Sequence, residues 1–462
     1  MKRTLSLLAL FVTTTLALAA DRKPNILLII SDDHGYGDVG AYGCKDIPTP
    51  HMDSLAKHGV RFTSGYVSGP YCSPTRAGLM TGRYQTRFGH EFNPGGATGA
   101  QPGLSQTETT LPHRLKAAGY KTGMVGKWHL GNDKEFHPLS RGFEEFFGFL
   151  GGAHSYVNGK AAGANPIMRG REPVEENQYL TDAFRREATA FIDRHEKEPW
   201  FLYLAFNAVH GPMDAAPRYL DRFPNHTGGR KTYATMLTAL DDAVGAVLDK
   251  LRQQGVEEHT LVLFVADNGG PEAVNSSDNG PLRGAKAQTW EGGIRVPFMM
   301  QWKGTLPAGK VYDQPVIQLD FHTTAAVAAG IEIKPEWKLD GVDLVPFLKG
   351  SKTGTPHDAL YWRFGQQMAI RMGDWKIVRA NGAGTGQERA QLRRDVVEDL
   401  AGAHLYNLAK DIGETTNLAE KEPEKFKQLA AAWTEWNKGN IKPTWFPGAG
   451  GGAKKKAKAK QE

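Results

Sequence analysis

The stretch NILLIISDD, residues 25–33, places five consecutive Ile and Leu residues directly before a serine and two aspartates. A short apolar run without polar alternation is typical of a strand that is buried on both faces. Such strands occur in parallel sheets covered by helices on both sides. We therefore predict that residues 25–30 form a central strand of an α/β sheet, with Asp32 and Asp33 at its carboxyl end.

Strand and helix patterns alternate around this segment through the first two-thirds of the chain. Further strands are predicted at residues 121–130, 200–210 and 260–269, and helices at residues 51–60, 110–120, 179–196 and 233–255. This order predicts a mostly parallel sheet flanked by helices.

The pattern changes near residue 356. Residues 359–380, ALYWRFGQQMAIRMGDWKIVRA, predict short antiparallel strands, and residues 422–439 predict a closing helix. We therefore expect a large domain over residues 20–355 and a smaller C-terminal subdomain of antiparallel strands and a helix over residues 356–447.

The two ends of the chain differ from this body. Residues 1–19 combine Lys2 and Arg3, an apolar run and a small-residue cleavage site, which predicts a signal peptide and export to the periplasm or the exterior. The apolar run is shorter than the roughly 20 residues of a membrane span, so no transmembrane segment is expected. Residues 448–462, GAGGGAKKKAKAKQE, predict a disordered Lys-rich tail.

The net charge of +6 comes from these ends. The leader contributes +2 and the tail +4, which leaves residues 21–447 without net charge. Nucleic-acid binding therefore has no electrostatic support in the body of the chain.

Polar side chains follow each of the four predicted strands. In an open α/β sheet, ligands bind at the carboxyl ends of the strands. The side chains in question are Asp32 and Asp33, Lys127 and His129, His210, and Asp267 and Asn268. Taken singly, an Asp pair after a strand also suits a turn or helix cap, and a lone histidine suits a structural role.

Asp32, Asp33, Asp267 and Asn268 offer only oxygen ligands, three of them charged. This set suits a hard cation, and four protein residues favour Ca²⁺ over Mg²⁺. Lys127 and His129 are two residues apart, so in a strand they would project from the same face and favour an anion. An exposed pair at a strand edge is the alternative.

One of the two cysteines lies in YCSPTRAGLMTGR, residues 71–83. Pro74 suits the first turn of a helix and Gly82 its end, so Cys72 is predicted at or just before the helix N-terminus. The free N–H groups there favour an anion, and Arg76 lies one turn further on. We expect an acidic, nucleophilic thiol facing an oxyanion. A disulfide between Cys44 and Cys72 is the alternative.

The C-x-P-x-R pattern of Cys72, Pro74 and Arg76 resembles the signature of the type I sulfatases, in the alkaline-phosphatase superfamily. The resemblance extends in order over roughly residues 22–440. It is carried by the blocks KPNILLIISDDHGYGDVGAYG, TPHMDSLAKHGVRFTSGYV, GYKTGMVGKWHLG, FLYLAFNAVHGP, ADNGG, RGAKAQTWEGGIRVP, AIRMGDWKIV and LYNLAKDIGETTNLA.

The resemblance implies an alkaline-phosphatase-like fold and a sulfuric ester hydrolase. It implies that a separate formylglycine-generating enzyme converts Cys72 to Cα-formylglycine, and that the modified residue binds one Ca²⁺ with Asp32, Asp33, Asp267 and Asn268. It also implies that Arg76, Lys127, His129, His210 and Lys286 surround the sulfate and the aldehyde. His34 receives no role.

In this scheme the hydrated aldehyde attacks sulfur, His210 donates a proton to the leaving alcohol with Lys286 nearby, and His129 accepts a proton as the aldehyde re-forms. Three alternatives to a sulfatase remain open. The first is a phosphodiesterase or phosphonate hydrolase of the same superfamily. The second is a non-catalytic binder of sulfated glycans, if Cys72 is unmodified, and the third is a surface-binding protein that acts through its tail.

We expect sulfated carbohydrates as substrates. Arg83, His90, His154 and Arg283 are candidates for contacting the sugar, and each is equally compatible with a structural role. The glycosylation sequons at Asn225 and Asn275 matter only in a eukaryotic secretory pathway.

Overall fold

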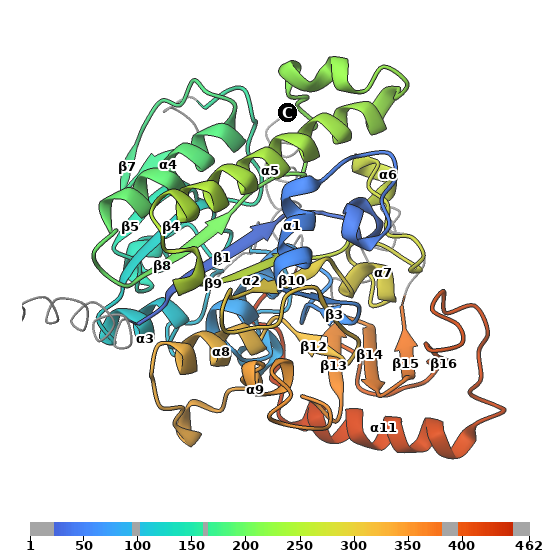
Figure 1. The fold of residues 1–462 in the computed structure, drawn as a ribbon. Helices are drawn as coiled ribbons and strands as arrows, with labels where there is room; N and C mark the ends of the chain where they lie inside the picture. The colour runs from blue at the N-terminus through green and yellow to red at the C-terminus, as the bar shows by residue number, and fades with distance from the viewer. Residues whose placement is uncertain (1–22, 95–101, 160–164, 381–395, 447–462) are drawn as a thin grey trace, which may run out of the picture.

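The computed structural model describes residues 23–94, 102–159, 165–380 and 396–446. Within them, a ten-stranded sheet forms the centre of the molecule (Figure 1). Its strands, in spatial order, are β11 (Lys310–Tyr312), β2 (Val60–Phe62), β10 (Phe298–Gln301), β9 (Thr260–Ala266), β1 (Asn25–Ser31), β8 (Trp200–Ala205), β4 (Lys121–Lys127), β5 (Glu145–Phe149), β6 (Met168–Arg169) and β7 (Glu172–Pro173). The five strands from β9 to β5 run parallel to one another, and β10 runs antiparallel between β9 and β2.

The central strand β1 is buried on both faces, as its sequence predicts. Ile26, Leu28 and Ile30 belong to one hydrophobic core, whereas Leu27 and Ile29 belong to a second core on the opposite face. Successive strand residues point to opposite faces, so one short apolar run supplies both cores. Each such side chain stabilises the fold by roughly 1.5–3 kcal/mol when fully buried.

Helices cover both faces of the sheet (Figure 1). One core is completed by α1 (Pro50–His58), α4 (Leu180–Arg194) and α5 (Gly228–Gln253). The other is completed by α2 (Cys72–Thr81), α3 (Leu111–Ala117), α8 (Asp320–Ala328) and α9 (Val345–Leu348). Two short helices, α6 (Glu272–Asn275) and α7 (Glu291–Ile294), follow β9, and a two-stranded sheet joins β3 (Gly65–Tyr66) to β12 (Val316–Ile317).

A four-stranded antiparallel sheet forms the smaller C-terminal part. It contains β13 (Leu360–Phe364), β14 (Gln367–Met372), β15 (Trp375–Arg379) and β16 (His404–Asn407). Helix α11 (Pro423–Lys438) packs on it through Leu429 and Trp433, and the Trp433 indole N–H donates to the Trp362 carbonyl at 3.1 Å. The predicted fold class, a mostly parallel sheet with a small antiparallel subdomain, is confirmed.

Buried charges join the small sheet to the rest of the molecule. We call the six residues Tyr66, Glu291, Arg295, Arg371, Lys376 and Glu414 the junction cluster. The Lys376 ammonium lies 2.9 Å from Glu291 Oε1 and 2.8 Å from Glu414 Oε1, and all three side chains are fully buried. The Tyr66 hydroxyl donates to Glu291 Oε2 at 2.5 Å, and Arg295 lies 3.2 Å from the same oxygen.

Most predicted elements agree with the structure, and the differences lie at element ends. Strand β4 ends at Lys127, so the prediction that Lys127 and His129 share one strand face was wrong. The reason is local: Trp128 turns into the core, where its indole N–H donates to the Phe136 carbonyl at 2.8 Å, and His129 adopts a left-handed conformation with φ of 59°. Likewise β8 ends at Ala205, before His210, and α5 begins at Gly228 rather than at residue 233.

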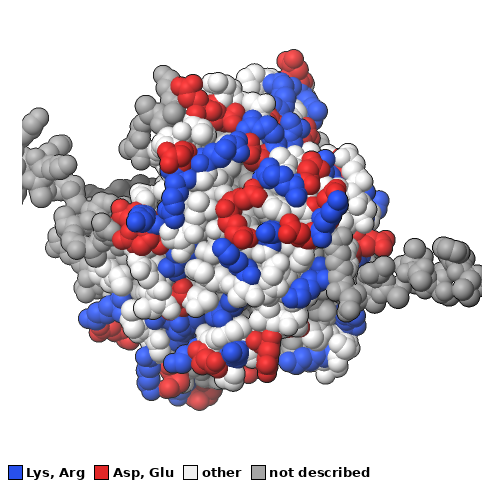
Figure 2. Space-filling model, turned by 90° about the vertical axis from the view of Figure 1, so that its left-hand side faces the viewer, with Lys and Arg blue, Asp and Glu red and all other residues white. Residues whose placement is uncertain are grey.

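The predicted signal peptide and Lys-rich tail lie outside the described residues. No helix in the described part of the chain is both long and apolar enough to cross a membrane. On the face drawn in Figure 2, Lys and Arg side chains are interspersed with Asp and Glu side chains, in keeping with a body that carries no net charge.

Candidate active site

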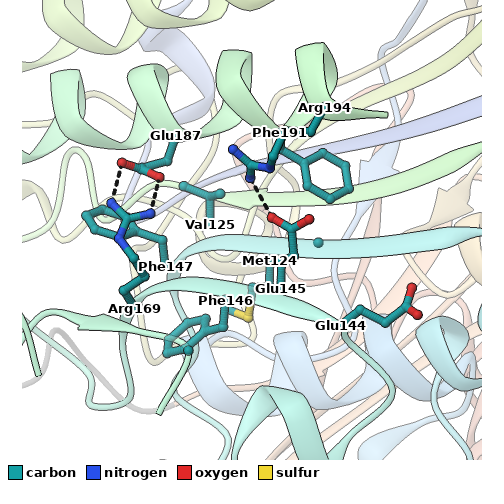
Figure 3. A pocket seen from close by; sticks show the side chains of 12 residues that line it. Met124, Val125, Glu144, Glu145, Phe146, Phe147, Arg169, Glu187, Phe191 and Arg194 are labelled. Carbon is teal, nitrogen blue, oxygen red and sulfur yellow. Dashed lines mark hydrogen bonds and ion pairs between the residues drawn. The ribbon is translucent and has the colours of Figure 1, made fainter. Parts of the chain in front are cut away.

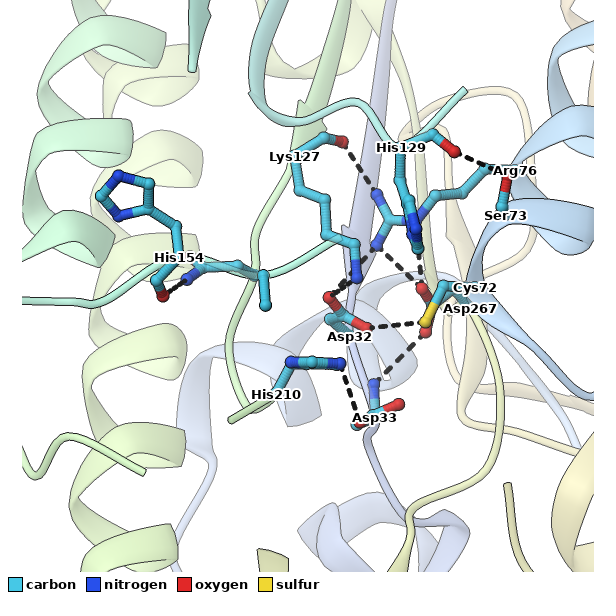
Figure 4. A network of polar contacts seen from close by, with 12 residues as sticks. Asp32, Asp33, Cys72, Ser73, Arg76, Lys127, His129, His154, His210 and Asp267 are labelled. Carbon is cyan, nitrogen blue, oxygen red and sulfur yellow. Dashed lines mark hydrogen bonds and ion pairs between the residues drawn. The ribbon is translucent and has the colours of Figure 1, made fainter. Parts of the chain in front are cut away.

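The polar residues that follow the central strands meet at one edge of the sheet (Figure 4). Strands β9, β1, β8 and β4 are neighbours and run parallel, so their carboxyl ends lie side by side. The loops are tied together there: the Asp32 N–H donates to the Ala208 carbonyl at 2.9 Å, and the Asp267 N–H donates to the Ser31 carbonyl at 3.0 Å. The structure thus brings together every strand-end residue that the sequence analysis singled out.

Helix α2 adds Cys72 to this edge. Cys72 is the first residue of the helix, Pro74 lies in its first turn, and Gly82 ends it with φ of 70°, as predicted. The Cys72 thiol donates to Asp32 Oδ1 at 3.5 Å, and the Lys286 ammonium donates to Cys72 Sγ at 3.3 Å. The helix therefore presents the cysteine to the carboxylates of β1 and to a lysine from the loop before α7.

The prediction of an acidic thiol at Cys72 was wrong. Burial raises the pKa of Cys72 far above its ordinary value, and the Asp267 carboxylate raises it further. Lys127 and Lys286 act in the opposite direction but do not compensate. The helix N-terminus and Arg76, on which the prediction rested, are outweighed by burial of the thiol and by the neighbouring Asp267 carboxylate.

The disulfide between Cys44 and Cys72 is excluded. Both cysteines are free. Cys72 is buried in the site, whereas the Cys44 thiol donates to Asp46 Oδ1 at 3.3 Å on the surface. Cys72 is therefore not consumed by a structural cross-link.

Three cations, two of them fully buried (Arg76 and Lys127) and one part-buried (Lys286), are paired with three buried carboxylates. Lys127 Nζ donates to Asp32 Oδ2 at 2.5 Å, and Lys286 Nζ donates to Asp33 Oδ1 at 2.6 Å. The Arg76 guanidinium donates twice to Asp267 Oδ2, at 3.0 and 2.9 Å. Although burial alone would raise the pKa of Asp33, Lys286 and His210 outweigh it and lower that pKa to about 2. Asp33 is therefore ionised, whereas burial, followed by the Asp32 carboxylate, raises the pKa of Asp267 to about 6 against the opposing effect of Arg76.

Arg76 lies in the cluster, near Cys72 and between two carboxylates. The contact with an anion that the sequence analysis expected of it stays a prediction. Its guanidinium holds Asp267 and donates through Nη1 to the Lys127 carbonyl at 2.9 Å. Arg76 thus links the end of β9 to the end of β4.

The donor atoms fit a hard cation. One ligand atom each from Asp32, Asp33, Cys72 and His210 lies within 4.8 Å of the others. Asn268 is fully buried, its amide nitrogen donates to Asp33 Oδ1 at 2.8 Å, and its Oδ1 has no hydrogen-bond partner among the described residues. A buried amide oxygen without a partner is costly unless a cation or donor meets it. Carboxylate and amide oxygens in this number suit Ca²⁺.

The two candidate histidines face the cluster in neutral form. Burial, followed by Lys127, lowers the pKa of His129 well below its ordinary value, and His129 Nδ1 has no partner among the described residues. His210 Nδ1 donates to the Gly211 carbonyl at 2.6 Å, which leaves Nε2 directed at Asp33 Oδ2, 3.6 Å away. Burial lowers the pKa of His210 to about 4.

Three of the four residues considered for sugar contacts have structural roles. Arg83 lies beyond the far end of α2 and pairs with both oxygens of Glu108 at 2.8 Å. His90 is buried against Ser73, 2.6 Å from its hydroxyl. Arg283 stacks on Trp290 and donates to the Glu414 carbonyl. His154 remains partly exposed, but it lies apart from the charged cluster in Figure 4.

Sequence reasoning missed the residues that hold the loops in place. The Ser73 hydroxyl contacts the His129 carbonyl at 2.6 Å, and the Tyr156 hydroxyl donates to the Asn207 and His210 carbonyls. Asn275 was considered only as part of a sequon, but its side chain is buried between Asp33 and Val209. No motif marks these residues, because each contacts main-chain atoms of segments distant in sequence.

A second pocket lies beside β4, β5 and α4, away from the strand ends (Figure 3). Four of its five charged residues, all but Glu144, are paired with one another. Arg169 and Glu187 form two hydrogen bonds of 2.7 Å, and Arg194 donates to Glu145 at 2.5 Å. This pocket therefore presents little free charge to a ligand, in contrast to the strand-end site.

A mostly parallel sheet that gathers carboxylates, cations and a helix-borne cysteine at its carboxyl edge is the arrangement of an enzyme of the alkaline-phosphatase superfamily, to which the comparisons assign the chain. The family model "Sulfatase" matches residues 24–331, and the model "N-sulphoglucosamine sulphohydrolase, C-terminal" matches residues 285–435. The chain belongs to the sulfatase family and is a type I sulfatase, an enzyme that hydrolyses sulfate esters.

Relatives agree with this assignment. N-acetylgalactosamine-6-sulfatase of Sus scrofa is 36% identical over 77% of this chain and 72% of its own length. The uncharacterized sulfatase YdeN of Escherichia coli is 35% identical over 74% of this chain and 68% of its own. The structure of Ps i-CgsB in complex with k-i-k-neocarrahexaose superposes with a TM-score of 0.85 at 34% identity, covering 95% of this chain and 98% of that one.

A phosphonate monoester hydrolase of Agrobacterium radiobacter also superposes, with a TM-score of 0.62 at 20% identity, over 88% of this chain and 96% of that one. This is a likeness of fold alone.

Proposed function

We propose that this sulfatase hydrolyses the sulfate monoesters of sulfated carbohydrates, using Cys72 matured to Cα-formylglycine and one bound Ca²⁺. The observation that carries the proposal is the setting of Cys72. It begins α2 at the sheet edge, 3.3 Å from the Lys286 ammonium and 3.5 Å from an Asp32 oxygen, among paired charges.

The raised pKa of the thiol supports maturation of Cys72. A thiol that burial and Asp267 keep protonated is a poor nucleophile. Conversion to an aldehyde by a formylglycine-generating enzyme replaces it with a group that works without ionising to a thiolate. Because Cys72 is fully buried in the folded chain, that enzyme must act before folding is complete.

Asp32, Asp33, Asp267 and Asn268, with residue 72, would hold Ca²⁺. The formylglycine hydrate would supply the attacking hydroxyl, and Ca²⁺ would polarise the sulfate oxygens. The support for the metal is the buried, unpartnered oxygen of Asn268 and the close grouping of Asp32, Asp33, Cys72 and His210 ligand atoms.

Charge balance explains why an anionic ester would bind. The three carboxylates are matched by Arg76, Lys127 and Lys286, so a divalent cation would leave the site with net positive charge. Lys127 is paired with Asp32 and Lys286 with Asp33, and both ammonium groups would turn towards the sulfate oxygens when the ester binds. Fixed cations in a buried site stabilise the charge that develops in the transition state.

His210 and His129 would carry out the proton transfers of the reaction. His210 would protonate the leaving alcohol through Nε2, which faces the cluster; because the neutral ring keeps its proton on Nδ1, bonded to Gly211, Nε2 would first have to take up a proton before it donates one. His129 would accept a proton from the second hydroxyl when sulfate is expelled, because its neutral ring has a nitrogen without a partner. Arg76 would keep Asp267 and the end of β4 in register.

The names of two relatives support a carbohydrate substrate. One is N-acetylgalactosamine-6-sulfatase, and the other, Ps i-CgsB, has been solved in complex with k-i-k-neocarrahexaose. We infer export to the periplasm or exterior from the leader of residues 1–19. The Lys-rich tail of residues 448–462 is assigned no part in turnover.

The test is turnover of a chromogenic aryl sulfate beside the matching phosphate and diester. The protein is co-expressed with a formylglycine-generating enzyme, and the mass of the Cys72 peptide confirms the aldehyde. We expect sulfate release that disappears in Cys72→Ala. Preference for the diester would transfer the chain to a phosphodiesterase role, and an unmodified Cys72 with glycan binding but no turnover would make it a binder.

A further inference from the structure

Asn275, the last residue of α6, joins three segments of the site through one buried amide. Its side chain is 1% exposed. Asn275 Nδ2 donates to the Asp33 carbonyl at 3.0 Å and to the Val209 carbonyl at 3.2 Å. Its Oδ1 accepts the Ser277 N–H at 3.0 Å. All the hydrogens of this amide are therefore directed at the loops that follow β1 and β8.

The first of these contacts bears on a strained residue. Asp33 has φ of 56°, a left-handed conformation that non-glycine residues adopt at a cost. Its N–H donates to Asp267 Oδ1 at 3.3 Å, and its carbonyl accepts from Asn275. The Asp33 main chain is thus held from both sides, which fixes the direction of a carboxylate that pairs with Lys286.

The second contact bears on His210. Val209 precedes His210, and its carbonyl accepts from Asn275 while its N–H donates to the Asp32 carbonyl at 2.7 Å. The His210 carbonyl is held by Tyr156. One amide therefore sets how far the imidazole of His210 stands from Asp33.

We propose that Asn275 is a positioning residue that holds Asp33 and His210 in register, so that it governs both Ca²⁺ affinity and protonation of the leaving group. The inference rests on the proposed function, because it assigns Asp33 to the metal and His210 to the leaving alcohol. Residues that orient metal ligands through hydrogen bonds commonly change metal affinity or activity by about 10–100-fold when they are replaced.

The same contacts give the sequon at residues 275–277 a definite outcome. A glycan on Asn275 Nδ2 would replace a hydrogen that now bonds Asp33 or Val209, at a side chain with no room for a sugar. Glycosylation of Asn275 and formation of the site therefore exclude each other. We expect active protein from a eukaryotic secretory host to carry an unmodified Asn275.

The experiment compares four proteins, each matured with a formylglycine-generating enzyme. Asn275→Ala removes the amide. Asn275→Asp keeps its size and acceptor oxygen but turns a second acceptor towards the two carbonyls. Ser277→Ala is the matched control, because it removes a buried hydroxyl without a described partner and leaves the Ser277 N–H bond to Asn275 intact.

Calorimetric titration of chelator-treated protein gives the Kd for Ca²⁺, and aryl sulfate turnover at saturating Ca²⁺ gives kcat and KM. We expect both Asn275 variants to bind Ca²⁺ about 10–100-fold more weakly and to lose kcat by a similar factor, with KM nearly unchanged. Ser277→Ala should match the wild type in all three quantities.

A structural role would give a different pattern. If the Asn275 variants have a lower Tm but wild-type Kd and kcat where they are folded, the positioning role is overturned. The same holds if neither variant folds while Ser277→Ala does. A wild-type protein that neither binds Ca²⁺ nor hydrolyses the aryl sulfate would instead overturn the proposed function, and the inference with it.

Discussion

Two buried clusters of charge lie in this molecule, the strand-end site and the junction cluster. Both pair carboxylates with lysine and arginine at nearly zero exposure. In the junction cluster, Lys376 lies between Glu291 and Glu414, and Arg295 and Tyr66 contact the same Glu291 oxygen. Glu414 Oε1 has no hydrogen-bond partner among the described residues, but the Lys376 ammonium lies 2.8 Å from it. In the strand-end site, by contrast, Asn268 Oδ1 and His129 Nδ1 have neither a hydrogen-bond partner nor an ion-pair partner in the described part of the chain.

The difference teaches that buried charge alone does not identify a functional site. The junction cluster is built from β3, the short helix α7, two strands of the small sheet and the segment after β16, and its ionic groups pair with one another. The strand-end site is built from the ends of four neighbouring strands, helix α2 and the loop that carries Lys286, and some of its buried donor and acceptor atoms have no partner. Its chemistry depends on groups that arrive from outside the chain, whereas the junction depends on none.

The largest expected effect concerns the junction. Lys376→Met leaves two buried carboxylates without their shared ammonium group, which should lower the free energy of unfolding by about 3–5 kcal/mol. Chemical denaturation measures the change. Lys427→Met, which removes an exposed pair with Glu424, should change stability by less than about 1 kcal/mol. A Lys376 variant of wild-type stability would mean that the junction holds nothing together.

A substitution in the strand-end site should lower activity while it changes stability little, the opposite of the effect expected in the junction cluster. Lys127→Met removes a cation proposed to contact sulfate, and kcat should fall by about 10²–10³-fold, or roughly 3–4 kcal/mol. The free energy of unfolding with Ca²⁺ present should change little, because the bound cation would also balance the negative charge of Asp32. The matched control is Lys121→Met at the exposed start of β4, which should keep full activity. Equal loss of activity in both variants would argue against a specific role for Lys127.

Removal of metal should affect one cluster only. A chelator should lower Tm of the wild type, because Ca²⁺ at 100 times its Kd contributes about 2.7 kcal/mol to stability. Differential scanning calorimetry with and without Ca²⁺ measures this. Lys376→Met should keep the full response and Asp33→Asn should lose most of it. A response that survives in Asp33→Asn would place the cation elsewhere.

The smallest effect is expected at a third charged contact, between His357 and Asp320. Burial opposes the protonated imidazole, but the Asp320 carboxylate, 2.8 Å away, outweighs it and raises the pKa of His357. A histidine whose pKa is raised on folding contributes stability below its unfolded value near 6.5, and the contribution is lost as pH rises through the folded value.

His357→Gln should therefore cost about 1 kcal/mol at pH 6 and less at pH 9. Urea denaturation at the two pH values gives the comparison. An equal cost at both would show that the pair acts as a neutral hydrogen bond.

Much of the fold could be predicted because it depends on local patterns. The apolar run of β1, the glycine that ends α2 and the alternation of strands with helices are properties of neighbouring residues. Neighbouring parallel strands have their carboxyl ends at the same edge of a sheet. The sequence alone therefore predicts that Asp32, Lys127, His210 and Asp267 lie together at one edge.

Only the tertiary structure decided how these groups act on one another. The partner of Arg76 lies 191 residues away, and the same carboxylate helps to keep the Cys72 thiol protonated. The contacts of Arg83, His90 and Arg283 and the three-way contact of Asn275 depend likewise on other segments of the chain. The sequence by itself determined which chemical groups lie at the strand ends. Their ionisation and their partners follow from burial and from distances between loops, which no local pattern encodes.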